Sequence, residues 1–459
     1  MPRVHSKTGG RDATTAVIPG RYVLSVGLPD LQAPRGWTWK ALSSVARLES
    51  GHTPSRKHPE YWGGSIPWVG IQDVTPNHGR VIRDTLEHTN QLGIENSSAR
   101  VLPENTVCLS RTASVGYVVV MGRPMATSQD FVNWVCSDAL NPHFLKYVLL
   151  AEQDALHMFA VGSVHQTIYF PEAKAFHVCM PERAEQDAII EVLGTLDEKI
   201  ELNRSMNETL GATARAIFKD WFVDFGPTRA KLEGLAPYLE SETWSLFPDQ
   251  VNDDGNPEGW QLTTLSAIAD INSESWSAQT RPNKVEYVDL ANTKWGTIES
   301  TEVHSWDAAP SRARRVLRHG DTIVGTVRPG NGSYALVDQD GLTGSTGFAV
   351  LRPKSAAYRE MVYCAATSAE NIEHLSHLAD GAAYPAVRPD VVGNTEIVLG
   401  PPAVTKAFSA MCATLIDRCE ANKRENKALA ATRDLLLPKL MSGEIRVRDA
   451  EKLAGQAAC

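Results

Sequence analysis

An internal repeat limits the possible folds of this chain more than any other feature of its sequence. Pro34–Trp37 (PRGW) returns as Pro257–Trp260 (PEGW), 223 positions later. An Asn-x3-Asn-x2-Leu pattern that begins at Asn203 recurs from Asn422, 219 positions later, and the echoes between these two strings keep the same order. We therefore expect two halves built on one plan instead of a single core.

Each half combines two kinds of sequence. About 140 residues of short β-prone runs, such as Asn105–Leu109 and Thr322–Val327, are separated by Gly, Pro, Asn and Asp and predict a β-rich globular domain. A long segment follows, in which seam positions are spaced four and three apart, from Ile189 to Trp221 and from Phe408 to Leu440. Such a seam over more than four heptads is typical of a coiled coil.

We expect the two helices to pair with each other in antiparallel orientation, because the chain must return through a second domain before the second helix starts. Residues 182–226 carry ten acidic and five basic residues, whereas residues 402–448 carry five acidic and nine basic residues. Two asparagines on each seam would fix the register. The alternative is that each helix packs only on its own domain. The expected pairing residues are Leu193, Leu196, Ile200, Asn203, Asn207, Leu210, Leu415, Asn422, Asn426 and Leu429.

The expected fold class is α+β, with two β-rich globular domains in pseudo-repeat, each followed by a long helix. The expected order along the chain is an N-terminal tail (1–34), a first globular domain (35–181), a central spacer helix (182–226), a linker (227–258), a second globular domain (259–401), a distal spacer helix (402–448) and a C-terminal tail (449–459). The linker is expected to be an extended connector, because it contains four prolines and an Asn-Asp-Asp-Gly-Asn run.

Composition and charge narrow the class of protein. The 459 residues are 42% hydrophobic and 22% charged, as in ordinary globular proteins. Long apolar runs and a signal-peptide pattern are missing, so we expect a cytoplasmic protein without a membrane partner. Seven cysteines without a C-x-x-C motif favour reduced thiols over disulfides or a zinc site. The net charge of −9 comes mainly from residues 182–258, which leaves the domains free to carry basic patches.

Motifs for catalysis and for nucleotide binding are missing from the sequence. It contains neither G-x-x-x-x-G-K-[ST] nor G-x-G-x-x-G. Asn141–Phe144 (NPHF) lacks the second proline of the turn that holds the base in adenine methyltransferases. Asp197–Lys199 (DEK) looks like part of a nuclease motif but lies inside a predicted helix, where ion pairs one turn apart explain it. We therefore expect a recognition subunit with no catalytic residue and no metal site.

Several strings together resemble the specificity (S) subunits of type I restriction-modification systems, in that family's order. The matching strings are Gly51–Ser55 (GHTPS), Pro59–Val69 (PEYWGGSIPWV) with Asp73, Ala126–Phe131 (ATSQDF), Pro181–Ile189 (PERAEQDAI), Leu196–Asn203 (LDEKIELN), Trp221–Phe225 (WFVDF) and Leu435–Ile445 (LLLPKLMSGEI). The second domain lacks G-x-T-P-S and Tyr-Trp-Gly-Gly, a divergence that two different half-sites would require.

The resemblance implies two target recognition domains that read a bipartite site in double-stranded DNA, one half per domain. It also implies two modification (methyltransferase) subunits as partners and, through them, the restriction (translocase and endonuclease) subunits. S-adenosylmethionine, ATP and magnesium would then be bound by partner subunits, which would supply the adenine methyltransferase and ATP-dependent endonuclease activities. The alternatives are the specificity chain of a related bipartite system that cuts beside its site, a coiled-coil scaffold that does not bind DNA, and a stand-alone methyltransferase or nuclease.

Two echoed turns carry the best candidates for base reading. Arg111 with Ser114, and Arg328 with Asn331, lie in equivalent Gly-containing turns between β-prone runs. Arginine bound to guanine through two hydrogen bonds is the most frequent specific contact to DNA bases. The alternative is a surface turn with ordinary ion pairs.

Further polar residues lie on loops or in basic clusters. Four arginines near residue 315 would contact phosphates or, alternatively, form a solvated face. Two pairs of hydroxyl, amide or imidazole residues lie on loops of the first domain. The complete set of expected DNA-contacting residues is Arg111, Ser114, Ser128, Gln129, His165, Gln166, Arg312, Arg314, Arg315, Arg318, Arg328 and Asn331.

Overall fold

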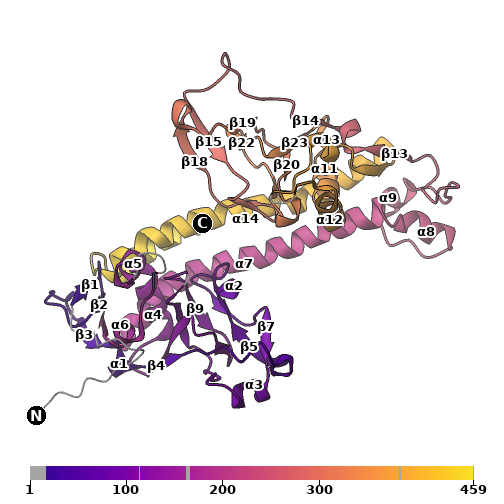
Figure 1. Ribbon diagram of the computed structural model, residues 1–459. Helices are drawn as coiled ribbons and strands as arrows, with labels where there is room; N and C mark the ends of the chain where they lie inside the picture. The colour runs from indigo at the N-terminus through magenta and orange to yellow at the C-terminus, as the bar shows by residue number, and fades with distance from the viewer. Residues whose placement is uncertain (1–16, 113, 162–165, 382–383, 458–459) are drawn as a thin grey trace, which may run out of the picture. The chain divides into compact units, whose positions relative to one another are not determined.

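The computed structural model describes residues 17–112, 114–161, 166–381 and 384–457, which form two compact units (Figure 1). Unit 1 comprises Met1–Glu201 and Glu425–Cys459, and unit 2 comprises Leu202–Arg424. The division falls inside two long helices, α7 (Arg183–Phe222) and α14 (Pro402–Met441), which have 40 residues each. Each unit therefore contains one globular domain and a part of both helices.

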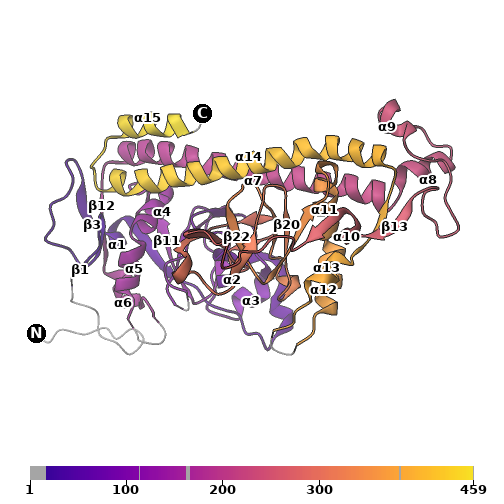
Figure 2. The same ribbon diagram turned by 90° about the horizontal axis from the view of Figure 1, so that it is seen from above.

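Helices α7 and α14 lie side by side in both views (Figures 1 and 2). In unit 2 the Asn207 side-chain amide on α7 donates to the carbonyl oxygen of Cys419 on α14 (3.2 Å), and the ring of Phe218 lies 6.1 Å from that of Phe408. The partner residue on α14 moves backward as the chain moves forward along α7. The antiparallel pairing predicted from the two seams is confirmed.

The described residues of unit 1 form three sheets and seven shorter helices. The sheets, in spatial order, are β1 (Ile18–Pro19), β2 (Leu24–Val26), β12 (Phe176–Met180) and β3 (Thr38–Ala41); β4 (Ala46–Ser50), β11 (Phe131–Cys136), β8 (Val107–Ser110), β9 (Val118–Met121) and β6 (Val81–Ile82); and β10 (Ala126–Thr127), β5 (Trp62–Val69) and β7 (Glu87–Thr89). The helices are α1 (Leu42–Val45), α2 (Ile71–Val74), α3 (Gln91–Glu95), α4 (Pro142–Ala151), α5 (Gln153–Phe159), α6 (Phe170–Lys174) and α15 (Val447–Ala457), and a 3₁₀ turn, η1, spans Pro59–Tyr61.

Unit 2 has a similar inventory. Its sheets are β13 (Gln261–Thr264) with β24 (Glu396–Leu399); β14 (Ala269–Ile271), β23 (Phe348–Pro353), β20 (Thr322–Gly325) and β21 (Tyr334–Leu336); β18 (Glu302–Ser305), β15 (Lys284–Val288), β22 (Leu342–Ser345) and β19 (Ala313–Val316); and β16 (Thr293–Lys294) with β17 (Thr297–Ile298). Its shorter helices are α8 (Gly226–Leu232), α9 (Ser241–Ser245), α10 (Leu265–Ile268), α11 (Arg359–Ala366), α12 (Ala369–Leu378) and α13 (Pro389–Gly393), with 3₁₀ turns η2 (Trp306–Ala308), η3 (Pro329–Asn331) and η4 (Ala356–Tyr358).

The two units repeat one strand topology. The antiparallel order β4-β11-β8-β9 in unit 1 matches β14-β23-β20-β21 in unit 2. The parallel pair β5 and β10 matches the parallel pair β15 and β22. All four residues of β8, and all four of β20, are buried, as expected for strands at the centre of a packed sheet. The predicted pseudo-repeat of two β-rich domains is confirmed.

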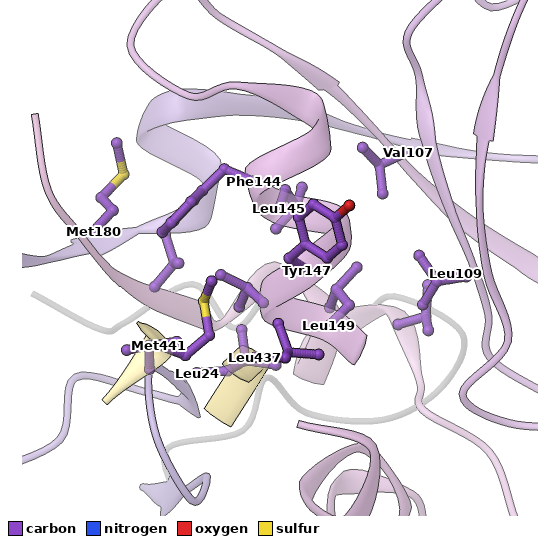
Figure 3. Close-up of a cluster of buried hydrophobic side chains, with 14 of the residues drawn as sticks. Leu24, Val107, Leu109, Phe144, Leu145, Tyr147, Leu149, Met180, Leu437 and Met441 are labelled. Carbon is purple, nitrogen blue, oxygen red and sulfur yellow. The ribbon is translucent and has the colours of Figure 1, made fainter. Parts of the chain in front are cut away.

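The domain and the helix segments of each unit share one hydrophobic core. In unit 1, Phe144 and Leu145 of α4 belong to the same buried cluster as Leu437 and Met441 of α14 (Figure 3). In unit 2, the cluster joins Phe222 of α7, Phe408 of α14 and Trp260 of the globular domain. Each helix thus packs both on its partner helix and on a globular domain, which combines the two alternatives left open by the sequence.

The N-terminal tail expected over residues 1–34 is folded where the structure describes it. Residues 18–26 form β1 and β2, and Val23, Leu24 and Val26 are buried. The carboxylate of Glu152 accepts the backbone N–H groups of Tyr22 and Val23, both at 2.6 Å. These strands are too short for a sequence pattern, and a sheet edge and a carboxylate distant in sequence stabilise them.

Two other segments also differ from expectation. Residues 447–457, mostly assigned to a C-terminal tail, form α15, with Ala450 and Ala454 buried against unit 1. The linker 227–258 is not extended throughout, because it contains α8 and α9. Its Phe247 is buried, with its ring 5.0 Å from that of Trp221. Apolar contacts with distant residues fold both segments.

Candidate nucleic-acid interface

The turn between β8 and β9 carries Arg111 and Ser114, and residues 111, 112 and 114–117 are called the arginine turn of unit 1. The hydroxyl of Ser110 holds this turn closed. It donates to the carbonyl oxygen of Ser114 (2.5 Å) and accepts the backbone N–H of Tyr117 (2.8 Å). The Ser110 hydroxyl therefore ties Ser114 and Tyr117 to the end of β8.

Gln129, in the connection between β10 and β11, lies next to Arg111. The Arg111 Nε donates to the carbonyl oxygen of Gln129 (3.0 Å). The two terminal amino groups of the guanidinium take no part in this hydrogen bond. Burial lowers the pKa of Arg111, against the opposing charge of Asp130. The protein thus orients the guanidinium through Nε, and a contact with guanine would use the two terminal amino groups.

Ser128 lies on the inside of the same connection. It is 1% exposed, and its hydroxyl donates to Asp130 Oδ2 (3.0 Å) and accepts the Asp130 backbone N–H (3.2 Å). The predicted role of Ser128 on DNA does not fit this burial, because short polar residues with local partners serve to hold turns. Ser128 is left out of the surface proposed below.

The loop after β4 adds two residues that sequence reasoning missed. The Thr53 hydroxyl donates to the side-chain oxygen of Gln129 (2.5 Å). The Arg56 guanidinium lies 3.8 Å from the ring centroid of Trp62 and makes two hydrogen bonds to the Glu87 carboxylate, at 2.5 and 2.6 Å. Thr53 thus contacts the residue that also binds Arg111, and Arg56 follows three positions later on the same loop.

A close approach of two backbones explains why this loop begins with glycine. A Cβ atom on Gly51 would lie 1.9 Å from the carbonyl oxygen of Ser128. Gly51 therefore lets the loop pack directly on the β10–β11 connection. The signal was present in the sequence, because Gly51–Ser55 belongs to the strings that resemble the family, but the strings alone do not show which surface they meet.

A pocket of about 440 Å³ opens beside the arginine turn of unit 1. Ser114 and the exposed Gln166 both line it, so the structure brings two of the predicted residues together. His165 lies outside the described residues. The other side chains that line the pocket include His78, Tyr117, Gln153 and His157.

Unit 2 presents Arg328 and Asn331 in the turn between β20 and β21, and residues 328–333 are called its arginine turn. Both side chains are exposed. The Arg328 backbone has a left-handed φ of 48°, and its N–H donates to the carbonyl oxygen of Pro385 (2.7 Å). The Arg328 guanidinium lies 4.9 Å from the ring centroid of Tyr384. The two predicted arginines thus occupy equivalent turns.

The four arginines predicted as phosphate contacts do not share one environment. Arg312 is exposed, whereas the Arg314 guanidinium lies 4.6 Å from the ring centroid of Trp306. Arg315 is half-buried, burial lowers its pKa, and its Nη1 donates to the Ser275 hydroxyl (3.2 Å).

Carboxylates offset the charge of the fourth arginine. Arg318 Nε donates to the Glu274 carboxylate (3.0 Å), which also pairs with Arg352 (3.1 Å). Arg352 makes two hydrogen bonds to Asp321, which raise its pKa. The cluster is therefore less cationic than its sequence suggests.

The connection between β22 and β23 brings Arg312 near the arginine turn of unit 2. The Thr346 N–H donates to the carbonyl oxygen of Arg312 (2.8 Å). The carbonyl oxygen of the next residue, Gly347, accepts the N–H of Thr326 (2.8 Å), two positions before Arg328. Arg312 and the turn thus form one candidate surface, as Gln129 and Arg111 do in unit 1.

The expected helix-pairing residues are buried or half-buried in the structure. In unit 2 the Asn422 side-chain amide donates to the side-chain oxygen of Asn207 (2.8 Å), which joins the two helices at one register. The predicted residues Leu193, Leu196, Ile200, Asn203, Asn422 and Leu429 are buried. The others, Asn207, Leu210, Leu415 and Asn426, are half-buried.

Three other properties of the described residues bear on the predictions. No described helix is long and apolar enough to cross a membrane. Among the same residues, no group of three or more His, Cys, Asp or Glu side chains could hold a metal ion. The six cysteines in the described part of the chain are free thiols, and all except Cys136 are buried.

Comparisons with known proteins show which proteins this chain is similar to. Residues 34–212 match the family described as the type I restriction modification DNA specificity domain. The chain is 25% identical over 426 residues to the type I restriction enzyme MjaIX specificity subunit of Methanocaldococcus jannaschii, which covers 91% of this chain and 95% of that protein. It is 24% identical over 393 residues to the HindI specificity subunit of Haemophilus influenzae, covering 71% of this chain and 84% of that protein.

A solved structure shares the fold. The S subunit of a type I restriction-modification system from M. genitalium aligns with a TM-score of 0.52 at 17% identity. The alignment covers 90% of this chain and 98% of that one. The likeness therefore extends over both units and is not confined to residues 34–212.

Proposed function

We propose that this chain, which is similar over most of its length to a type I restriction enzyme specificity subunit, is a specificity subunit that reads a bipartite site in double-stranded DNA, with one half-site read by each unit. The observation that carries this proposal is the repeated fold with two equivalent arginine turns. The side chains around Arg111 differ from those around Arg328, as two different half-sites would require. The arginines read guanine, and the neighbouring polar groups position the duplex.

The chemistry belongs to partner subunits. Specificity subunits of type I systems are not catalytic, and this chain is a non-catalytic subunit of that kind. We propose that two modification subunits and, through them, restriction subunits assemble on it. S-adenosylmethionine, ATP and magnesium would be bound by those subunits, and this chain would direct their adenine methylation and DNA cleavage to one sequence.

Exchange of one domain tests the division of labour. The exchanged segment is residues 17–182, because β1 and β2 belong to the sheet of the first domain. Replacing it with the equivalent segment of another specificity subunit should change one half of the methylated sequence and leave the other unchanged. The reciprocal exchange of residues 259–401 is the matched control. Methylome sequencing reads both, and a change in both halves, or in neither, contradicts the proposal.

We further propose that the long helices set the distance between the half-sites. Because the helices are antiparallel, a test must lengthen both. Inserting seven residues between Glu201 and Leu202, and seven between Arg424 and Glu425, preserves the heptad seam. Each insertion adds about 10 Å at 1.5 Å per residue, which is close to three base-pair steps of about 3.4 Å.

The recognised gap should then lengthen by about three base pairs while both half-sites keep their sequences. Inserting seven residues in α7 alone is the matched control. It should abolish binding, because α7 is then longer than α14 and residues that pair in the wild type no longer face each other. An unchanged gap in a fully active double-insertion variant would leave the helices as docking surfaces only.

A further inference from the structure

Each unit places an edge-to-face pair of aromatic rings against its arginine turn. In unit 1 the rings of His78 and Tyr117 lie 5.4 Å apart at an angle of 83°. In unit 2 the rings of Trp295 and Tyr334 lie 6.0 Å apart at 88°. Both members of the pair are displaced by 217 positions between the units, which is also the displacement between the two arginines. The aromatic pair is therefore part of the repeated design.

The backbone beside the pair is repeated as well. Gly79 and Gly296 follow the first ring, and both have left-handed φ angles, of 79° and 88°. The Gly79 N–H donates to the carbonyl oxygen of Val118 (2.7 Å), and the Gly296 N–H donates to that of Tyr334 (2.9 Å). In both units the first ring is therefore followed by a left-handed glycine, but only Trp295 has a left-handed φ itself, so the two turns differ in type.

Trp295 is presented outward at a conformational cost. Its side chain is 65% exposed, and its φ of 45° is one that bulky residues rarely adopt. It begins the two-residue turn between β16 and β17, where Asn or Gly is normally preferred. Trp295 is exposed, so packing in a hydrophobic core does not explain a tryptophan at a position that suits glycine. Strained backbone conformations of this kind are frequent at functional sites.

The surroundings hold the indole in place. The ring lies against the arginine turn so closely that a Cβ atom on Gly332 would come within 2.6 Å of it. Lys423 of α14 donates to the carbonyl oxygen of Gly296 (2.6 Å) and pairs with Glu420 (2.8 Å), which ties the hairpin to the helix. A rigid, exposed aromatic ring beside an arginine is the arrangement that binds the face of a nucleobase.

We propose that Trp295 stacks on a DNA base that is displaced from the duplex beside the half-site read by unit 2. The proposal rests on the DNA-reading function proposed above. Arg328 reads guanine as proposed above, the exposed Arg312 of the same surface attracts the phosphate backbone, and the indole contacts a neighbouring base through its face. Such a contact requires no particular base, because every base has a π face.

Unit 1 replaces this platform with a hydrogen-bond donor. The His78 Nδ1 accepts the Val118 backbone N–H (3.1 Å), so the proton of the neutral ring lies on Nε2. The smaller imidazole lines a polar pocket and contributes a donor instead of a large apolar face. We therefore expect DNA to be unstacked beside the half-site of unit 2 and to remain stacked beside that of unit 1.

The test uses the full chain assembled with its modification subunits on DNA that carries the recognised site. Permanganate oxidises unstacked thymines, and 2-aminopurine fluorescence reports unstacking at other positions. Besides the bases that the modification subunits flip out for methylation, the wild type should give one further reactive position, in or beside the half-site of unit 2. Trp295→Gly should abolish that signal and weaken specific binding about 5- to 150-fold, from the usual contribution of base–aromatic stacking. Trp295→Phe should retain most of both, and Leu262→Ala, at an apolar residue of unit 2 that is 61% exposed, should leave the signal unchanged.

Trp295→Gly also separates a functional role from a structural one. Glycine suits the left-handed backbone, so the melting temperature should stay the same or rise while binding falls. A lower melting temperature with unchanged binding and unchanged unstacking would overturn the proposal and make Trp295 a structural residue. Loss of modification-subunit binding with intact DNA affinity would also overturn it, in favour of a protein contact. A wild-type complex without any sequence preference would instead contradict the proposed DNA-reading function.

Discussion

The two units attach their domains to the long helices by different chemistry. In unit 1, Asp197 of α7 accepts hydrogen bonds from Lys146 (3.0 Å) and Tyr147 (2.7 Å) of α4 and from Arg433 of α14 (2.9 Å). Three elements thus meet at one carboxylate. Burial raises the pKa of Asp197, but the charges of Lys146 and Arg433 outweigh this effect and the pKa is lowered.

In unit 2, aromatic rings make the corresponding junction. Phe408 of α14 lies 5.1 Å from Phe222, 6.0 Å from Trp221 and 6.1 Å from Phe218, all of α7, measured between ring centroids. The ring of Trp260, from the globular domain, lies 5.6 Å from that of Phe222. The comparison teaches that one fold can be held either by a directional ion network or by ring packing. The first fixes geometry, and the second contributes more net stability.

The largest expected effect is on the aromatic junction. Phe408→Ala should destabilise unit 2 by about 3–5 kcal/mol, because the side chain is fully buried and leaves a cavity. Hydrogen exchange of the full chain should show lost protection in unit 2 and little change in unit 1. Met411→Ala, at a position 38% exposed on the same helix, is the matched control and should have little effect. Equal loss in both units would show that the junctions are not separate.

Disrupting the ionic junction of unit 1 should lower the free energy of unfolding somewhat less. Asp197→Asn leaves Lys146 and Arg433 without their shared counter-charge and should destabilise unit 1 by about 3 kcal/mol, since the Asp197 side chain is only 22% exposed. The same exchange experiment should now show the loss in unit 1. Asp434→Asn removes another partner of Arg433, but one that is 63% exposed, so it should cost much less. If the two variants behave alike, Asp197 is not the centre of the junction.

Variants in the two arginine turns allow the DNA binding of the two units to be compared. Arg111→Ala and Arg328→Ala should each reduce specific binding by about 1–3 kcal/mol and relax one position in a different half of the site. A phosphate contact would instead weaken all sequences alike and flatten the salt dependence. Binding to matched and singly substituted sites at two salt concentrations distinguishes these results. Arg388→Ala, at an arginine whose side chain is 82% exposed, is a matched charge control.

The smallest expected effect is a difference in pH dependence. The lowered pKa of Asp197 means that its stabilisation of unit 1 is present above the unfolded value of about 3.9 and is lost as the pH falls through the lower folded value. Burial raises the pKa of Glu420 in unit 2 despite Lys423, so stability there should rise as the pH falls toward the usual glutamate value of 4.5. Protection factors from hydrogen exchange should therefore change in opposite directions near the two carboxylates on acidification. Asp197→Asn and Glu420→Gln should each remove one of the two trends.

Local sequence chemistry was sufficient to identify some of the candidate site. Arg111 and Arg328 were identified because a Gly-containing turn between two buried strands must reach the surface, and the repeat places both at one equivalent position. Ser128 has the same kind of side chain and a similar loop position, yet its hydroxyl is turned inward to Asp130. A sequence shows that a residue is polar and near a turn, but it does not show which side of the turn the side chain occupies.

The apparent nuclease string shows the same limit. Asp197–Lys199 was correctly placed in a helix, but its ion pairs are not those between neighbouring turns of that helix. Asp197 pairs with α4 and α14, and Lys199 lies 3.5 Å from Glu425 of α14. These partners are distant in the sequence, so only the packing of three elements reveals them.

The two repeated halves, the β-rich domains and the paired helices could be predicted from the amino-acid sequence, because repeats and hydrophobic periodicity follow from local spacing along the chain. Tertiary structure alone decided that β1, β2 and α15 belong to unit 1, that Thr53 supports Gln129, and that Trp295 faces Tyr334. Trp295 and Tyr334 are 39 positions apart, as are His78 and Tyr117. Such contacts form when separate strands and loops pack together, and no local pattern in the chain specifies which distant residues will meet.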